Sequence, residues 1–259
     1  MTRQHLSFLC EGEELAATLD HSAGTTGLLI VSGGNELRAG AFAGQAHLAA
    51  RLAAAGHPVF RFDRRGVGDS SGLNRGFLHS GPDIRAAVAS FRAQAPHLRR
   101  IVGFGICDAA TALVLTPDAG LDALILANPW VLDDASSANP PPPPAIRARY
   151  REKLRRPAEW RRLLTGGISP AKLLRGLATA TRPNAARPTP LAAALQHGIA
   201  AFARPVHILL AERDRTAQIF AAQWDKADPR IIRCPGASHA FAEDDAREWL
   251  YNQVVKCLT

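Results

Sequence analysis

The segment Gly103-Phe104-Gly105-Ile106-Cys107-Asp108-Ala109-Ala110 joins an apolar run to an alanine-rich run, and it indicates how the rest of the chain folds. Small residues, Gly105 and Ala109, stand two positions before and two positions after Cys107. A nucleophile on a sharp strand-to-helix turn needs small residues there, because strand and helix approach each other closely. The pattern therefore predicts that Cys107 is such a nucleophile. A small buried core cysteine is the alternative that this segment alone leaves open.

Position 107 holds cysteine where serine is more usual on turns of this kind. A helix that starts directly after the cysteine presents unpaired amides and the positive end of its dipole, and both favour the thiolate. Because the thiolate is the nucleophilic form of cysteine, we expect a reactive thiol at Cys107.

On both sides of this segment, short apolar runs alternate with alanine-rich helical stretches. Apolar runs without internal alternation predict strands that are buried on both faces, as in a parallel sheet covered by helices. The alternation of the two element types favours an α/β fold. Strands are predicted at 6–10, 15–19, 27–31, 57–63, 100–105, 121–127, 205–210 and 230–234, and helices at 41–55, 82–95, 108–115 and 243–258.

Two later loops carry the side chains that activate a nucleophile. Asp214 follows the seventh predicted strand, and His239 follows the eighth. Functional groups of open α/β sheets collect at the carboxyl ends of strands, and the chain order nucleophile, acid, histidine suits this architecture. His239 is therefore the predicted general base, with Asp214 orienting its imidazole. The alternative acids are Glu212, Asp133 and Asp134.

An oxyanion hole requires two backbone amides that converge where negative charge develops. The amide of Asp108, directly after the nucleophile, is the first predicted donor. The loop Ser32-Gly33-Gly34-Asn35 follows a long core strand, and Gly34 or Asn35 is predicted to supply the second donor. An ordinary glycine turn is the alternative interpretation of this loop.

The positive charge of the chain is concentrated in one segment. The net charge is +8, but residues 145–182 contain 11 Lys and Arg and two acids, which is +9. Five prolines, Pro140–Pro144, precede this segment as a stiff spacer. Residues 135–189 are therefore predicted to be a proline-rich linker and basic helical lid, inserted into a core of 1–134 and 190–259. An apolar stripe that includes Tyr150, Leu154 and Trp160 would face the substrate or pack on the core.

Composition argues against several other classes of protein. No apolar run reaches the roughly 18 residues of a membrane span, and the first residues lack the apolar stretch of a signal peptide. The cysteines Cys10, Cys107, Cys234 and Cys257 form no C-x-x-C pair, which argues against zinc and a disulfide scaffold. No complete dinucleotide fingerprint or P-loop occurs. We expect a cytoplasmic protein that requires no metal or cofactor and binds no nucleic acid.

Taken together, these motifs resemble the α/β-hydrolase superfamily over nearly the whole chain. Asp63–Ser70 is similar to the loop after the fourth strand in its serine-aminopeptidase-like, or hydrolase-4-like, branch. The cysteine turn and the Gly-Gly-Asn loop look like exosortase A system-associated hydrolase 1, a family that accompanies bacterial exopolysaccharide and protein-sorting gene clusters. The resemblance implies an α/β-hydrolase fold: a mostly parallel eight-stranded sheet, flanking helices and a helical lid. Cysteine in place of serine departs from the commoner pattern, although dienelactone hydrolases share it.

Two classes of function follow from these expectations. The first is a hydrolase or acyltransferase that acts on an ester, lactone or thioester through Cys107, His239 and Asp214, with an acyl-thioester intermediate. Its partner is a small-molecule acyl substrate. The second is a non-catalytic protein that docks to an anionic membrane, polysaccharide or partner through the basic segment. The sequence carries no signal of oligomeric state.

Overall fold

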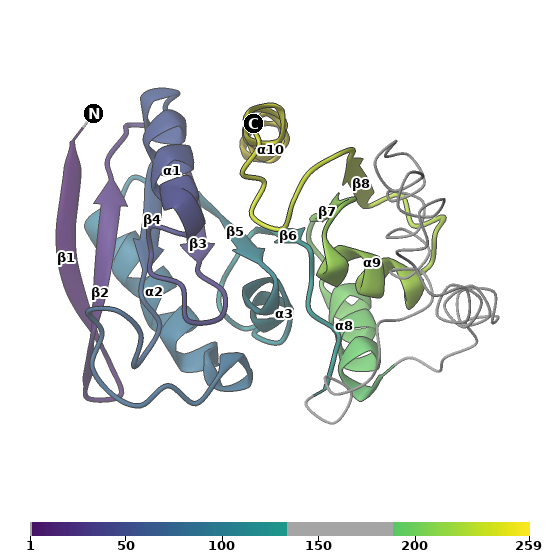
Figure 1. The fold of residues 1–259 in the computed structure, drawn as a ribbon. Coiled ribbons are helices and arrows are strands. Elements are labelled where there is room, and N and C mark those ends of the chain that lie inside the picture. Colours follow the sequence, from purple (N-terminus) through teal and green to yellow (C-terminus); the bar gives the residue numbers. More distant parts are fainter. Residues whose placement is uncertain (1, 134–188) are drawn as a thin grey trace, which may run out of the picture.

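A computed structural model describes residues 2–133 and 189–259. Within them, eight strands form one sheet in the order β1-β2-β4-β3-β5-β6-β7-β8 (Figure 1). The first two strands are antiparallel to their neighbours, and every pairing from β4 to β8 is parallel. The strands are β1 (Arg3–Cys10), β2 (Glu13–Asp20), β3 (Thr26–Val31), β4 (Val59–Phe62), β5 (Arg100–Ile106), β6 (Ala123–Ala127), β7 (Val206–Ala211) and β8 (Ile231–Cys234).

Helices cover both faces of this sheet, and each face has its own apolar core. One core lies beneath α2, α3, α8 and α9, and the other lies beneath α1 and α10 (Figure 1). The helices are η1 (Ala41–Ala43), α1 (Gly44–Ala54), η2 (Phe77–His79), α2 (Gly81–Gln94), α3 (Asp108–Val114), α8 (Pro190–Ala201), α9 (Arg215–Ala222) and α10 (Asp244–Leu258).

The alternation of side chains along β5 assigns its residues to the two cores. Val102, Phe104 and Ile106 are buried on the α1 and α10 side. Gly103 and Gly105 face the other helices, and a Cβ atom added at Gly105 would lie 2.7 Å from the backbone of Ala109. The missing side chains therefore let α3 lie directly against the strand that leads into it.

The fold agrees with the predicted mostly parallel eight-stranded sheet flanked by helices, and all eight predicted strands occur. The helix predicted at 41–55 is shorter at its start, because Phe42 and Ala43 adopt left-handed backbone angles and α1 begins at Gly44. Two helices, α8 and α9, were not predicted. The predicted linker and lid at 135–189, with Tyr150, Leu154 and Trp160, lies outside the described residues except for Thr189, which caps α8.

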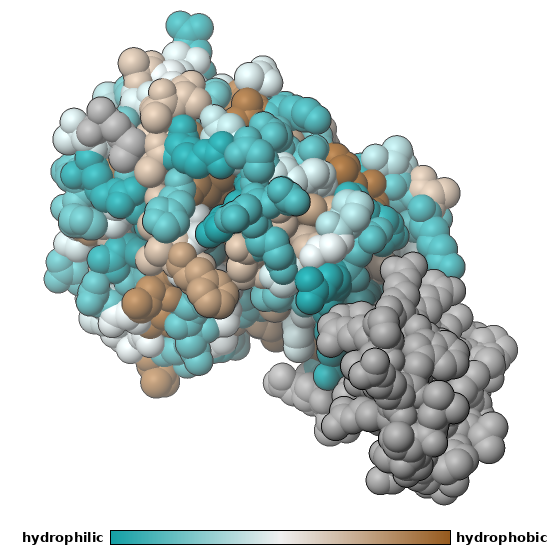
Figure 2. Space-filling model, turned by 45° about the horizontal axis from the view of Figure 1, so that its top comes forward, coloured by the Kyte–Doolittle hydropathy of each residue, from teal (hydrophilic) through white to brown (hydrophobic). Residues whose placement is uncertain are grey.

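The surface of the described residues is mainly hydrophilic in the view of Figure 2, with hydrophobic side chains in small separate groups. None of the described helices is long and apolar enough to cross a lipid bilayer. Across residues 2–133 and 189–259, no cluster of three His, Cys, Asp or Glu side chains is arranged to hold a metal ion.

Candidate active site

Cys107 lies on a strained turn between β5 and α3. Its backbone angles are φ 63° and ψ −126°, a region that residues with a side chain rarely occupy. Two hydrogen bonds hold the turn: the Cys107 amide donates to the Ala127 carbonyl at 2.9 Å, and the Cys107 carbonyl accepts from the Trp130 amide at 3.2 Å. The side chain of Cys107 is half-buried, whereas the other three cysteines are buried. This is the geometry of a nucleophile elbow.

His239 and Asp214 come from two separate loops at the same edge of the sheet and form an ion pair. Nδ1 of His239 lies 3.0 Å from Oδ1 of Asp214. The second oxygen of Asp214 accepts the amide of Ala217 at 2.9 Å and thereby caps α9, so the carboxylate is held from both sides. The side chain of Asp214 is 7% exposed and that of His239 is 40% exposed. The pair therefore has one fixed, buried member and one that substrate can reach.

The imidazole of His239 has a strongly raised pKa, of about 10. Its hydrogen bond with Asp214 is the largest cause, a hydrogen bond with Cys107 is the second, and burial opposes both. At neutral pH this imidazole is therefore protonated. The protonated ring lies beside the same cavity as Cys107, where it is placed to give a proton to a group that leaves from a bound substrate.

Asn128 positions the loop that carries His239. Its side chain is fully buried at the end of β6. Nδ2 donates to the His239 carbonyl at 3.0 Å, and Oδ1 accepts the Ala211 amide at 2.8 Å. One side chain thus joins the ends of β6 and β7 to the histidine loop. The sequence interpretation missed this role, because Asn128-Pro129 has the ordinary pattern of a strand end.

Among the alternative acids, Glu212 is exposed, and the described ion pair of His239 is with Asp214. Asp133 is the last residue of a described segment, and Asp134 lies outside the described residues.

The two predicted sources of oxyanion donors are in contact with each other. The Gly34 amide donates to Oδ1 of Asp108 at 2.7 Å, so this amide is already occupied. Oδ2 of Asp108 lies 3.4 Å from Arg64, whose buried guanidinium also donates to the Gly34 carbonyl. A Cβ atom at Gly33 would lie 2.8 Å from Oδ1 of Asp108. Asn35 is exposed, and its side chain accepts from Asn74 at 2.8 Å.

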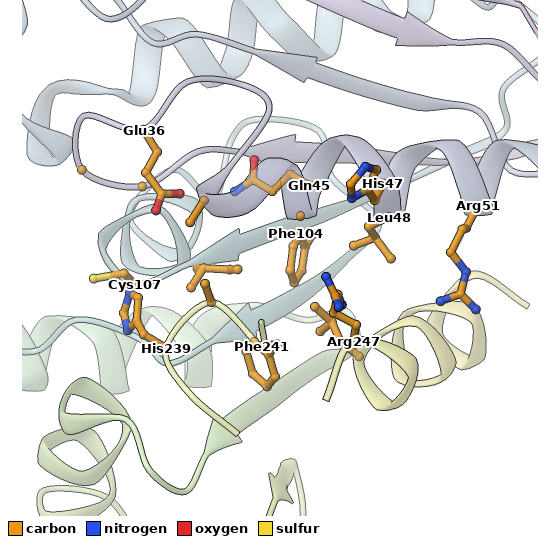
Figure 3. A pocket seen from close by; sticks show the side chains of 17 residues that line it. Glu36, Gln45, His47, Leu48, Arg51, Phe104, Cys107, His239, Phe241 and Arg247 are labelled. Carbon is orange, nitrogen blue, oxygen red and sulfur yellow. The ribbon is translucent and has the colours of Figure 1, made fainter. Parts of the chain in front are cut away.

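A cavity of about 190 Å³ opens beside Cys107 and His239. It runs between α1 and α10 and over the end of β5, as Figure 3 shows. Most of its wall is apolar, and polar side chains stand at both ends and along α1. The apolar side chains are Ala41, Leu48, Phe104, Ile106, Ala240, Phe241 and Leu250, and the polar ones besides the catalytic candidates are Glu36, Gln45, His47, Arg51 and Arg247.

Glu36 is the acidic side chain at the Cys107 end of this cavity (Figure 3). Burial raises its pKa, and the charge of His239 opposes that effect. The sequence interpretation missed Glu36, because an acid in a loop between a glycine turn and a helix has no distinguishing pattern.

A model of the family described as "Alpha/beta hydrolase family" matches residues 28–253 of the chain. No curated protein matches the chain.

Solved structures share the fold at low sequence identity. An esterase of Pyrococcus furiosus, Pf2001, is 13% identical with a TM-score of 0.61, covering 100% of this chain and 94% of its own. The alpha/beta hydrolase GrgF from Penicillium sp. sh18 is 16% identical with a TM-score of 0.64. The match covers 98% of this chain and 97% of the GrgF chain. An alpha-beta serine hydrolase homologue from Coxiella burnetii is 17% identical with a TM-score of 0.60. The match covers 100% of this chain and 99% of the Coxiella chain.

Proposed function

Because this chain belongs to the alpha/beta hydrolase family, we propose that it hydrolyses or transfers the acyl group of an ester, lactone or thioester with Cys107 as the nucleophile. The observation that supports the proposal is the 3.0 Å contact of His239 with Asp214 beside one cavity that Cys107 and His239 share, with Cys107 on a strained turn. Each member comes from a different loop at the carboxyl ends of the strands, where α/β sheets collect their catalytic groups.

In the first half of the reaction, the Cys107 thiolate forms a bond to the substrate carbonyl carbon, and the carbonyl electron pair moves onto oxygen. When the carbonyl re-forms, the bond to the leaving oxygen or sulfur breaks. The leaving group takes the proton of the His239 imidazolium, and an acyl-thioester on Cys107 remains.

In the second half, water or an acceptor alcohol gives a proton to neutral His239 and attacks the thioester carbonyl. Collapse of that intermediate breaks the carbon–sulfur bond. It releases the acid or new ester and restores the thiolate–imidazolium pair. Asp214 keeps its hydrogen bond to Nδ1 throughout, which orients the ring and stabilises its charged form.

The oxyanion is proposed to bind the amide of Asp108 together with an amide of the 33–35 loop. The Gly34 amide can donate to the oxyanion only after its hydrogen bond to the Asp108 carboxylate breaks. The Asn35 amide can donate to the oxyanion without breaking that bond. An anionic carboxylate at the Gly34 amide competes for the same donor as the developing oxyanion.

A thiolate is a good nucleophile and also a good leaving group, so it suits activated esters, lactones and thioesters better than amides. No metal or cofactor takes part in the proposed steps. The sequence resemblance to exosortase A system-associated hydrolases adds a proposed setting among bacterial exopolysaccharide and protein-sorting functions. We also propose a cytoplasmic location.

The test is turnover of p-nitrophenyl esters by Cys107→Ala beside a matched control, Cys257→Ala, which removes a buried thiol of α10. We expect Cys107→Ala to lose turnover and rapid labelling by iodoacetamide, and the control to keep both. Full turnover by Cys107→Ala would overturn the proposal.

The concentration of positive charge in residues 145–182 favours a second candidate, docking to an anionic surface. Charge reversal at Arg155, Arg156, Arg161 and Arg162 tests it by sedimentation with anionic lipid vesicles or with an anionic polysaccharide. Binding that these reversals abolish, in a protein without acyl turnover, would favour docking over catalysis. Acyl turnover without binding to either surface would reject docking.

A further inference from the structure

Gln45 is a buried polar side chain of the cavity whose hydrogen-bonding capacity is only half used. It is 4% exposed and lies in the first turn of α1. Its Oε1 accepts a hydrogen bond from Oγ of Ser32 at 3.0 Å. Its Nε2 is buried and finds no acceptor among the described residues. Within residues 2–133 and 189–259, the two N–H bonds of this cavity-lining side chain therefore have no protein partner.

The protein holds this side chain in place. Gly40 has φ 73°, and a Cβ atom there would lie 2.6–2.9 Å from the aliphatic part of Gln45. The glycine backbone thus packs closely against the chain of Gln45, while Ser32 holds its oxygen. In Figure 3 Gln45 lies at the start of α1, with the loop residue Glu36 on one side, His47 of α1 on the other and Phe104 below it. A buried donor in a fixed orientation is costly unless it is paired, by roughly the desolvation free energy of the group.

We propose that Gln45 is a specificity-determining residue that donates a hydrogen bond from Nε2 to an oxygen on the acyl chain of the substrate. The inference rests on the proposed function, since it assigns the cavity beside Cys107 to the acyl group. The substrate class is an acyl chain that carries a carbonyl or similar acceptor oxygen along its length, in place of a plain hydrocarbon chain.

The size and lining of the cavity agree with this class. An apolar cavity of roughly 150 Å³ holds benzene, so about 190 Å³ accommodates a short acyl chain of similar bulk. The side chains below Gln45, such as Phe104 and Leu48, are apolar and fit the hydrocarbon part. A site built to hydrogen-bond a substrate oxygen rejects the analogue without it, because the donor then stays buried and unpaired.

The experiment measures kcat/KM for N-acetylcysteamine thioesters of hexanoic acid and of its 3-oxo, 4-oxo and 5-oxo derivatives. We expect at least one oxo chain to exceed hexanoyl by about tenfold, the size that one paired buried donor supplies. In Gln45→Met, which keeps the length of the side chain and removes its donor, that ratio is expected to fall to near one. Gln94→Met, an exposed residue at the end of α2, is the matched control and keeps the ratio.

The outcomes separate this inference from the proposed function. Turnover of every thioester with no oxo preference, or with a preference that Gln45→Met retains, would overturn the inference and leave Cys107 catalysis standing. The 3-hydroxy and 4-hydroxy thioesters are measured beside the oxo series, and a preference for them without any for oxo chains would also overturn the inference. That pattern requires an acceptor in the cavity, because a hydroxyl can donate a hydrogen bond and a carbonyl cannot. Equal loss on all chains in Gln45→Met would instead assign Nε2 to the reacting oxygen.

Binding provides a readout that does not depend on turnover. Isothermal titration with hexanamide and its three oxo derivatives tests the same pairing in the intact protein. One oxo amide is expected to bind about tenfold more tightly than hexanamide, and this advantage is expected to vanish in Gln45→Met. Equal affinity of all four amides for the unmodified protein would refute the inference even if no thioester were turned over.

Discussion

The carboxylate of Asp108 accepts the amide proton of Gly34 at 2.7 Å, and this contact places a negative charge on an expected oxyanion donor. The two residues are far apart in the sequence, yet both adjoin the nucleophile. Asp108 follows Cys107 directly, and the loop of Gly34 packs against the turn so closely that Gly33 has no room for a side chain. In the proposed reaction, this contact limits the number of amides that can face the substrate carbonyl.

Replacing Asp108 by Ala is expected to raise kcat for a simple p-nitrophenyl ester, because it frees the Gly34 amide. One oxyanion donor contributes about 10²–10³ in kcat, so a rise of about tenfold or more is expected. Asp108→Asn keeps an acceptor for Gly34 and is expected to give a smaller rise. Steady-state kinetics measures both, and a fall in kcat in both variants would show that the carboxylate supports the site instead.

Asp214→Asn is expected to lower the pKa of His239 from about 10 towards its ordinary value of 6.5, because it removes the largest cause of the shift. The substituted amide retains an oxygen that can cap α9, so the fold is expected to persist. NMR titration of the His239 ring protons measures the change, with Asp225→Asn, an exposed site, as control. An unchanged titration would contradict the role assigned to Asp214.

The raised pKa of His239 also determines the pH range over which stability and acylation are expected to change. In the folded state the imidazolium is favoured, so the pair's contribution to stability is complete below pH 6.5 and is lost as the pH rises through about 10. Acylation needs the same proton for the leaving group. Single-turnover acylation by an ethyl ester, whose alkoxide must be protonated in order to leave, is therefore expected to stay level from neutral pH and to decline near pH 10. A decline centred near pH 6.5 would contradict this expectation.

Asn128→Gly is expected to destabilise the protein by about 1–3 kcal/mol, because the Ala211 amide and the His239 carbonyl lose their partner. Glycine suits the native φ of 47°, so the substitution removes the side chain without backbone strain. Urea unfolding measures the stability, and kcat reports the placement of His239. Asn252→Ala, on the exposed face of α10, is the control, and an equal small effect at both sites would contradict the role of Asn128.

Gly105→Ala is expected to destabilise the protein by roughly 1–3 kcal/mol and to reduce turnover, because the new methyl group would lie 2.7 Å from the backbone of α3. Gly44→Ala offers a matched comparison, since nothing lies within 4 Å of a Cβ atom there. It is expected to leave stability unchanged or slightly increased. Equal unfolding free energies for the two variants would contradict the close approach of strand and helix at Cys107.

Much of the fold follows from local patterns. Apolar runs such as 121–127 must be buried on both faces, and small residues around Cys107 are compatible with a turn between strand and helix. The helices α8 and α9 were not predicted, although α8 is apolar and begins with Thr189 and Pro190, an N-terminal signal of the usual kind. The start of α1 was misplaced because the left-handed angles of Phe42 and Ala43 have no counterpart in side-chain polarity.

For the candidate site as well, some features follow from the sequence and others only from the tertiary structure. Residue types and chain order predicted Cys107, Asp214 and His239, because each follows a strand and the carboxyl ends of parallel strands share one edge of a sheet. The structure brings Asp214 and His239 into contact and places Cys107 and His239 beside one cavity, while their catalytic roles remain a proposal. The contact of Asp108 with Gly34 and the bridge through Asn128 join residues from different elements. The amide nitrogen of Gln45 is buried by several elements and has no partner in the part of the chain that the structure describes. Such relationships depend on how elements approach in three dimensions and on which polar groups become buried, and a linear pattern contains neither distance nor burial.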